Sequence, residues 1–488
     1  MFENVLGQEA AAQLSQDILK DTLAPSMLFR GQAASGKGTA ALELARVLSC
    51  QDVGGKNGGG QGGQNGRALW NCACPACSRH RLLYHPDLLV LGPRSFSREI
   101  AAAARIFAAE SGETASRLLF IRAVRKLLIR FSPVLWEDDS KAGKLSPLIE
   151  SLEADLDEII ARFGTEAGAE KAPDGDWATK IGEGILKNAF KLEAEGIGEL
   201  IPVAHIRRAA YWSRMAPQGR RKFLLIENAD RMQDAARNAL LKILEEPPDR
   251  VAIVLTTAHG DALLPTIRSR LRPYRFYPRS AEVEKEVIRR VFHNAPSPQG
   301  ELSAEAAVQM GSLLPAYLDS FLPVSPERLY PLAAYLAASV TYQAVVTFKA
   351  RRSSPLPEEL VALGKHAAPI AEAAGLGRPA KDTGSCVQGI LAGAEKFEVP
   401  GLFAQFLRQL LRVVSGGLRG TAAGPDQGLL APGQAAFLPG GTAALADIWR
   451  TAVGEAADAA GVYNQGVSLV LDRLCTELKG RITGLYAG

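Results

Sequence analysis

Short apolar runs alternate with amphipathic segments over residues 1–280 of the chain. Four runs have the length and composition of buried strands, at residues 26–29, 86–93, 222–228 and 251–258. Residues 1–22 and 231–248 carry apolar side chains at helical spacing, and Pro247 and Pro248 stop the second of these helices. Alternating strands and helices predict an α/β domain with a parallel sheet.

The remaining pattern is mostly helical. Three amphipathic segments within residues 95–200 precede a polar stretch at 164–177, and we interpret this part as an inserted helical hairpin with a mobile loop. Helical spacing also continues from residue 279 to residue 488, interrupted by a Gly/Pro-rich stretch at 416–441. The chain is therefore expected to contain an α/β part followed by helical domains.

Composition narrows the class of protein. A length of 488 residues corresponds to about three domains, and 47% hydrophobic with 22% charged residues is ordinary for a globular protein. The net charge of +4 neither requires nor excludes nucleic acid. Six cysteines in a long chain argue against a disulfide-bonded secreted protein, and the sequence has no signal-like start or membrane-length apolar run. A cytoplasmic protein without a membrane partner is expected.

The segment "FRGQAASGKGTA" at residues 29–40 follows the first strand and opens a helix. Gly31, Gly36 and Lys37 reproduce most of a phosphate-binding loop, in which backbone N–H groups and a lysine hold phosphate. Such a loop continues with a hydroxyl residue that binds Mg²⁺, but this chain has Gly38 there. Thr39 is one helical residue further, about 100° around the axis, and is expected to point away from a metal.

Several motifs occur in a characteristic order. They are "VLGQEAA", "GQAASGKGT", a cysteine cluster, "HPDLLVL", "NALLKILEEPP", "LTTA" and "TIRSRLRPYRF". The chain resembles the clamp-loader branch of the AAA+ ATPases over residues 1–50, 70–93 and 200–280. The resemblance implies a hetero-oligomer that opens a sliding clamp and loads it onto primer-template DNA as part of the DNA polymerase III holoenzyme. It implies other loader subunits, gamma/tau and delta, as partners.

The resemblance also implies a domain organisation. Residues 1–278 would form an AAA+ P-loop NTPase-like domain with a Gly-rich insertion at 54–66 and a helical insertion at 95–200. Residues 279–344 would form a small helical lid, and residues 345–488 an all-α collar for oligomerisation.

In this family the ATPase sites lie between subunits, and the nucleotide-binding side is altered here. Active relatives end the acidic strand with Asp-Glu, whereas this chain has Glu227 and Asn228. An asparagine cannot act as the general base. Thr257 stands where relatives place a polar sensor of nucleotide, with a purely local hydroxyl contact as the alternative. We expect ATP and Mg²⁺ binding to be weak or absent, with no ATPase activity of the chain itself.

The arginine-donating side is kept. "TIRSRLR" resembles the family's Ser-Arg-Cys motif, so Ser269 and Arg270 are the candidates for an arginine finger that acts in trans. The alternatives are a surface arginine, a genuinely ATP-hydrolysing gamma/tau-type subunit, and an unrelated P-loop enzyme, which the motif order disfavours.

Family members bind a structural Zn²⁺ through four cysteines, which here would be Cys50, Cys72, Cys74 and Cys77. The single residue between Cys72 and Cys74 is unusual, so the sequence leaves open whether His80 replaces one ligand. Buried, reduced cysteines are the alternative to a metal site.

Basic residues cluster just before the third strand, and a loader must contact DNA phosphates. They are Arg207, Arg208, Arg214, Arg220, Arg221 and Lys222. A solvated helix face is the alternative for each of them, and "RKLLIR" at 125–130 is a second, weaker candidate.

Overall fold

The protein was analysed as a computed structural model that separates into two compact units, Met1–Phe321 and Leu322–Gly488. The structure describes residues 1–52, 68–93, 96–137, 139–163, 175–198, 200–293, 313–321, 399–419, 441–461 and 465–485, and short runs and single positions between 329 and 387. The Gly-rich insertion at 54–66, part of the predicted lid and most of the 416–441 stretch lie outside these residues.

The first unit contains a five-stranded parallel sheet in the order β2-β3-β4-β1-β5. Its strands are β1 (Ser26–Gly31), β2 (Leu88–Leu91), β3 (Lys222–Ile226), β4 (Val251–Thr257) and β5 (Arg272–Phe276). The first four confirm the strands predicted from the apolar runs. β5 was not predicted, because Pro273 and outward arginines break the apolar run that marks a buried strand.

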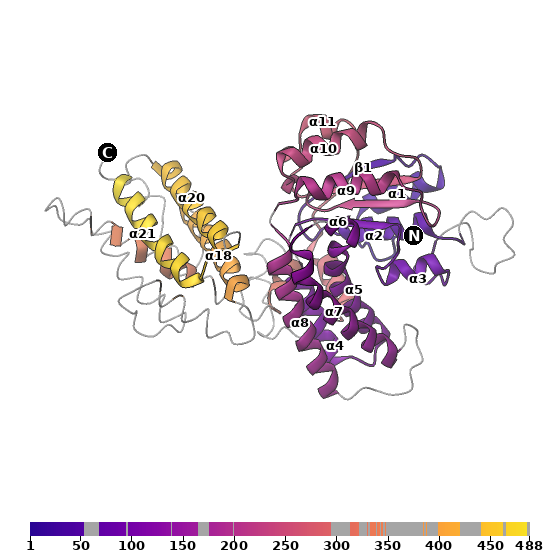
Figure 1. Cartoon of the computed structure of the whole chain (residues 1–488), viewed down its shortest axis with the longest axis horizontal. Helices are drawn as coiled ribbons and strands as arrows, with labels where there is room; N and C mark the ends of the chain where they lie inside the picture. Colours follow the sequence, from indigo (N-terminus) through magenta and orange to yellow (C-terminus); the bar gives the residue numbers. More distant parts are fainter. Residues whose placement is uncertain are drawn as a thin grey trace. The chain divides into compact units, whose positions relative to one another are not determined.

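Both faces of the sheet are covered, as expected for parallel strands. Side chains alternate between two cores: Leu28, Leu224 and Ile253 lie on one face, whereas Phe29 and Phe223 lie on the other. The first face packs against helices of the insertion and against α9 and α10, and the second against α1 and α2 (Figure 1). The sheet and its two helical layers confirm the predicted α/β fold class with a parallel sheet.

The helices outside the insertion are α1 (Glu9–Leu19), α2 (Lys37–Ser49), α3 (Pro75–Arg81), α9 (Val203–Arg214), α10 (Asp234–Glu245), α11 (Pro265–Arg268), α12 (Ala281–Val291) and α14 (Leu313–Asp319). The described residues also form short 3-10 turns: η3 (Ala229–Arg231) precedes α10, η4 (Gly260–Ala262) precedes α11, and η2 (Ile129–Phe131) lies within the insertion. The predicted helix at 231–248 is confirmed as α10, with Ala236, Leu240 and Ile243 buried on one face.

The insertion is larger than the predicted hairpin. It comprises α4 (Ser97–Ala109), α5 (Thr114–Leu128), α6 (Pro133–Trp136), α7 (Ala142–Phe163) and α8 (Gly175–Gly196). α4 packs against α5 and α8, and α7 packs against α8 (Figure 1). The end of the predicted loop was wrong, since residues 175–177 open α8; residues 164–174 lie outside the described part of the chain. Apolar residues on α8 join the core of the insertion, and this tertiary packing fixes the helix.

In the second unit, the helical pattern is confirmed for α18 (Val399–Arg419), α20 (Gly441–Gly461) and α21 (Val467–Leu485). α20 contacts both other helices around the buried Trp449. The boundaries of a separate lid and collar stay a prediction. Among the described helices, none combines the length and hydropathy needed to cross a bilayer.

Candidate functional site

The loop between β1 and α2 lies at the carboxyl edge of the parallel sheet. Glu227 and Asn228 follow β3, and Thr257 ends β4, so the topology brings them to the edge that carries Gly31, Gly36 and Lys37. Thr39 is exposed on α2, one residue beyond the site. This edge is where open α/β sheets place their ligands. That these residues form a nucleotide site with weak or absent binding of ATP and Mg²⁺ stays a prediction.

The Lys37 side chain is turned onto its own loop. Its Nζ donates to the carbonyl oxygens of Gly31 and Gln32, both at 2.5 Å, and contacts Ser35 Oγ at 3.4 Å. Only 7% of the residue is exposed. Burial lowers the pKa of Lys37 to about 8, although Glu227 and Asp230 favour the charged form. An ammonium group has three donors, and all three are engaged within the loop.

A second cation, Arg279, reaches the same loop from the segment between β5 and α12. Its Nη1 donates to Ala34 O at 2.6 Å, and its Nε donates to Leu6 O at 3.1 Å. Gly36 has a left-handed φ of +93°, and a Cβ atom at this position would lie 2.5 Å from Nη2 of Arg279. The guanidinium therefore lies directly against the phosphate-loop backbone.

The acidic strand end is also occupied. Glu227 Oε2 accepts a hydrogen bond from Nη2 of Arg130, which follows α5 in the insertion. The other carboxylate oxygen, Oε1, lies 2.7 Å from where a Cβ at Gly38 would stand. The hydroxyl residue usual at position 38 would therefore meet Glu227 as it is held here. The contact between Arg130 and Glu227 was not predicted from the sequence, because the two residues are 97 positions apart.

The neighbouring polar groups are satisfied locally. Asn228 has a left-handed φ of +49°, and its N–H donates to Thr256 Oγ1 at 3.2 Å. Thr257 Oγ1 donates to Asp230 at 2.6 Å and accepts from the N–H of His259 at 2.9 Å. The Thr257 hydroxyl therefore has the local contacts that the sequence left open as the alternative to nucleotide sensing.

The predicted arginine finger lies at the surface after α11. Arg270 donates to Thr266 O and to Glu245, both at 2.8 Å, and 35% of its side chain is exposed. Ser269 Oγ donates to the same Thr266 carbonyl at 3.1 Å. Among the described residues, an exposed carboxylate and a backbone carbonyl of α11 hold the guanidinium, so a stronger anion brought by another molecule could displace them.

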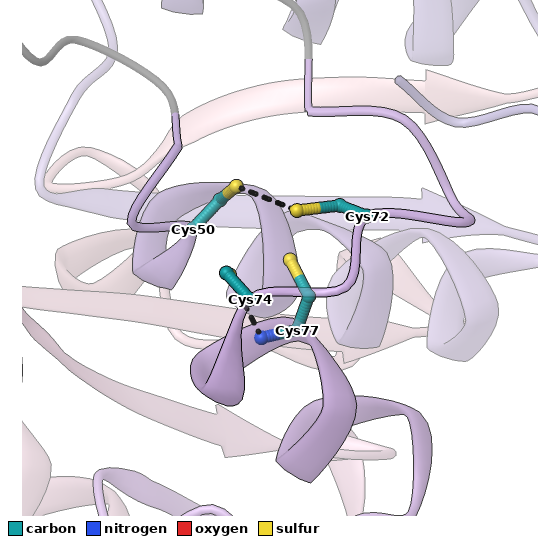
Figure 2. A group of neighbouring side chains, drawn as sticks. All are labelled: Cys50, Cys72, Cys74 and Cys77. Carbon is teal, nitrogen blue, oxygen red and sulfur yellow. Dashed lines mark hydrogen bonds between the residues drawn. The ribbon is translucent and has the colours of Figure 1, made fainter. Parts of the chain in front are cut away.

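The four candidate cysteines come together (Figure 2). Cys50 ends α2, Cys74 caps α3, and Cys72 and Cys77 flank that cap. All four sulfur atoms lie within 4.8 Å of one another, and those of Cys50 and Cys72 are 3.7 Å apart. Tetrahedral Zn²⁺ with bonds of about 2.3 Å places thiolates about 3.8 Å apart. The cluster is thus close enough to hold a metal ion, and its spacing suits zinc.

His80 is not part of this group. Its ring stacks on His85 at 4.2 Å between centroids, and neither ring nitrogen has a hydrogen-bond partner among the described residues. Burial and neighbouring cations hold the pKa of His80 well below its usual range, so the ring is neutral. The short spacing between Cys72 and Cys74 is compatible with a four-cysteine set, and no substitute ligand is required.

Arg46 supplies positive charge beside the cysteines. It is 1% exposed, pairs with both carboxylate oxygens of Glu43 at 2.6 and 2.9 Å, and donates to Cys77 Sγ at 3.1 Å. It also donates to the carbonyls of Ala68 and Leu69. A Zn²⁺ with four thiolates carries a net charge of −2, and a guanidinium hydrogen-bonded to one sulfur offsets part of it.

We expect Arg46→Met to lower the free energy of unfolding of the first unit by about 3–5 kcal/mol, because Glu43 would stay buried without its partner. Urea denaturation followed by tryptophan fluorescence measures the change. The control is Arg289→Met, which removes an ion pair with Glu286 on an exposed helix surface and should leave the midpoint nearly unchanged. Equal effects of the two substitutions would contradict the expectation.

The basic cluster is divided by the fold. Lys222 is 4% exposed and donates to Trp212 O at 2.6 Å, so its predicted DNA contact is wrong. Arg208 and Arg220 donate to backbone carbonyls of Leu135 and Cys50. Arg207 and Arg214 are exposed on α9, on either side of the 72% exposed Tyr211. In the second candidate segment, Arg130 is buried.

Comparison with known proteins identifies related sequences. The family model described as DNA polymerase III, delta subunit, matches residues 165–280. The gamma/tau subunit of Mycobacterium tuberculosis DNA polymerase III (strain H37Rv) is 34% identical over 89 residues, which is 18% of this chain and 15% of that protein. The delta' subunit of Pseudomonas aeruginosa is 37% identical over 91 residues, 18% of this chain and 28% of that protein.

A shorter match is the delta' subunit of Yersinia pestis, 46% identical over 55 residues, 11% of this chain and 16% of that protein. The chain thus spans less than a third of the length of these relatives. A crystal structure of a DNA polymerase III gamma subunit-related protein from Thermotoga maritima aligns with 62% of this chain and 90% of that one, at 18% identity and a TM-score of 0.28. Residues 165–280 match the DNA polymerase III delta-subunit family, and the chain's similarity to gamma/tau and delta' subunits supports the clamp-loader family to which its motifs point.

Proposed function

We propose that the chain is a non-hydrolysing, delta prime-type subunit of the DNA polymerase III clamp loader that donates Arg270 to the ATPase site of a neighbouring subunit. The observation that carries this proposal is the engagement of all three Lys37 donors by the loop itself. Gly38 and Asn228 remove the hydroxyl and the carboxylate that hydrolysis requires. Ser269 and Arg270, by contrast, remain at an accessible surface.

The isolated chain is expected to show no ATP turnover above a preparation carrying Lys37→Ala. The physical reason is that neither a metal-binding hydroxyl nor a general base is present at positions 38 and 228. Phosphate release from the purified full chain, with and without primed DNA, measures this. Turnover that Lys37→Ala abolishes would support the second candidate function instead.

That second candidate is an ATP-hydrolysing gamma/tau-type subunit. It is kept because gamma/tau and delta' subunits match at similar identity, 34% and 37% over comparable lengths. The residues of the loop and of the strand end favour the first candidate.

We propose a structural Zn²⁺ held by Cys50, Cys72, Cys74 and Cys77. In the proposed assembly, a hetero-oligomer in the cytoplasm, residues 345–488 pack with the other subunits as a collar. The loader acts on the sliding clamp and on primer-template DNA. Arg207 and Arg214, one turn either side of Tyr211 on α9, are exposed members of the basic cluster and are the residues we propose for phosphate contacts.

A further inference from the structure

We propose that Arg130 takes the electrostatic place of a divalent cation beside Glu227, so that the acidic strand end next to the nucleotide-like loop is neutralised by the chain's own guanidinium and does not take up Mg²⁺. This inference deepens the proposed function, because it names what replaces the metal in a site that does not hydrolyse ATP.

The fit of Mg²⁺ to the residues present is poor. Mg²⁺ in such sites uses one or two carboxylates together with the phosphates of the substrate. The Glu227 carboxylate is bound to Arg130, and position 38 offers no oxygen ligand. The nearest cation of the loop, Lys37, is directed to backbone carbonyls and not to a ligand position.

The surroundings are shaped to hold the guanidinium in this place. Arg130 is 5% exposed, and its Cζ atom lies 5.1 Å from the centre of the Phe96 ring. A Cβ at Gly92, after β2, would lie 3.1 Å from Glu227 Cβ and 3.5 Å from Arg130 Cζ. Gly92 and Gly38 therefore leave room on two sides of the Arg130–Glu227 pair.

Glu227 also provides the main negative charge that compensates the buried Arg130. Its Nε and Nη1 have no hydrogen-bond partner among the described residues, so only Nη2 is engaged by an acidic group. Burying a guanidinium with two unpaired nitrogen atoms is unfavourable unless a carboxylate compensates. Because Arg130 belongs to the insertion, the same contact links the insertion to the edge of the sheet.

The test compares the full chain with Arg130→Met, Glu227→Gln and the double variant. The matched control is Arg117→Met, which removes an equally buried arginine of the insertion that donates to carbonyls of Ser111 and Gly112. Each protein is titrated with Mn²⁺ and ATP, and binding is followed by the electron paramagnetic resonance signal of free Mn²⁺. Thermal unfolding is recorded in parallel.

We expect wild type and Arg117→Met to show no Mn²⁺ response beyond that of ATP alone. Arg130→Met should bind Mn²⁺·ATP at least about tenfold more tightly than wild type, because the freed carboxylate becomes available as a ligand. The double variant should lose this gain. Arg130→Met should also lower Tm by on the order of 5–10 °C, and the double variant should recover part of that loss.

Two results would overturn the proposal. The first is Mn²⁺·ATP binding by wild type that is lost in Glu227→Gln. The second is an Arg130→Met variant that folds but shows no Mn²⁺ response. If Arg130→Met does not fold, the comparison of wild type with Glu227→Gln tests the proposal. The absence of Mn²⁺·ATP binding by both proteins supports it. Phosphate release tests the proposed function separately. A chain that binds Mn²⁺·ATP, and so contradicts this inference, can still be unable to hydrolyse ATP.

Discussion

Replacing Arg270 by alanine is expected to slow ATP hydrolysis at the neighbouring subunit's site by about 10³-fold or more in the assembled loader. A guanidinium supplied in trans neutralises charge that develops on the transferring phosphoryl group, and no other group takes over that role when it is removed. In the described part of the chain, Arg270 is held by the exposed Glu245 and by a backbone carbonyl of α11, so breaking these contacts costs little when the chain docks.

The measurement is single-turnover hydrolysis in a loader reconstituted with wild-type or variant chain, with assembly checked by gel filtration. Arg268→Ala is the matched control, because Arg268 lies two residues away, is similarly exposed and pairs with Asp261 at 3.0 Å. We expect it to leave hydrolysis within a few-fold of wild type. An assembled Arg270→Ala loader with normal single-turnover rates would remove the arginine finger from the proposal.

Loss of the metal from the cysteine cluster is expected to have the second large effect. Cys50 ends α2 and Cys77 belongs to α3, so an ion bound by both would tie together segments separated by the residues at 53–67. Binding of structural zinc contributes about 10–16 kcal/mol in small zinc domains, although a larger domain retains part of its structure without the metal. We expect one equivalent of Zn²⁺ per chain and a lower Tm of the first unit after chelation.

Metal analysis of the purified chain and thermal unfolding with and without a chelator test this expectation. Cys77→Ser should reduce bound Zn²⁺ well below one equivalent. Cys475→Ser is the control, because this cysteine belongs to the second unit, partly buried against its helical core. A chain that folds normally, contains no metal and does not respond to chelator would leave the four thiols as buried, reduced cysteines.

The elements that the sequence predicted correctly are those whose pattern is local. Buried parallel strands are continuous apolar runs. The apolar residues on one face of α10, followed by two prolines that end the helix, are an equally clear local pattern. α8 and β5 were missed because their apolar positions are interrupted, and tertiary packing decides their conformation. The fold class was accessible for the same reason, since strand and helix alternation defines it.

The candidate site was predicted unevenly. The cysteine cluster was found because four thiols within a short span are chemically distinctive, and the structure brings the same four together. The site contacts of Arg130 and Arg279 were missed, because the sequence does not show which distant carboxylate or carbonyl a basic side chain will meet. Lys222 was wrongly included among the candidate DNA contacts for the same reason. The sequence does not show that its ammonium group is buried and donates to the Trp212 carbonyl.

The strand β5 forms one edge of the sheet and carries Pro273 between two exposed arginines, Arg272 and Arg275. An open strand edge can recruit a strand from another molecule and so begin aggregation, and proline and charged side chains oppose this. In the proposed assembly, the chain exists as free polypeptide before it meets the other subunits. The composition of β5 is expected to oppose edge-to-edge pairing between copies of that unassembled polypeptide.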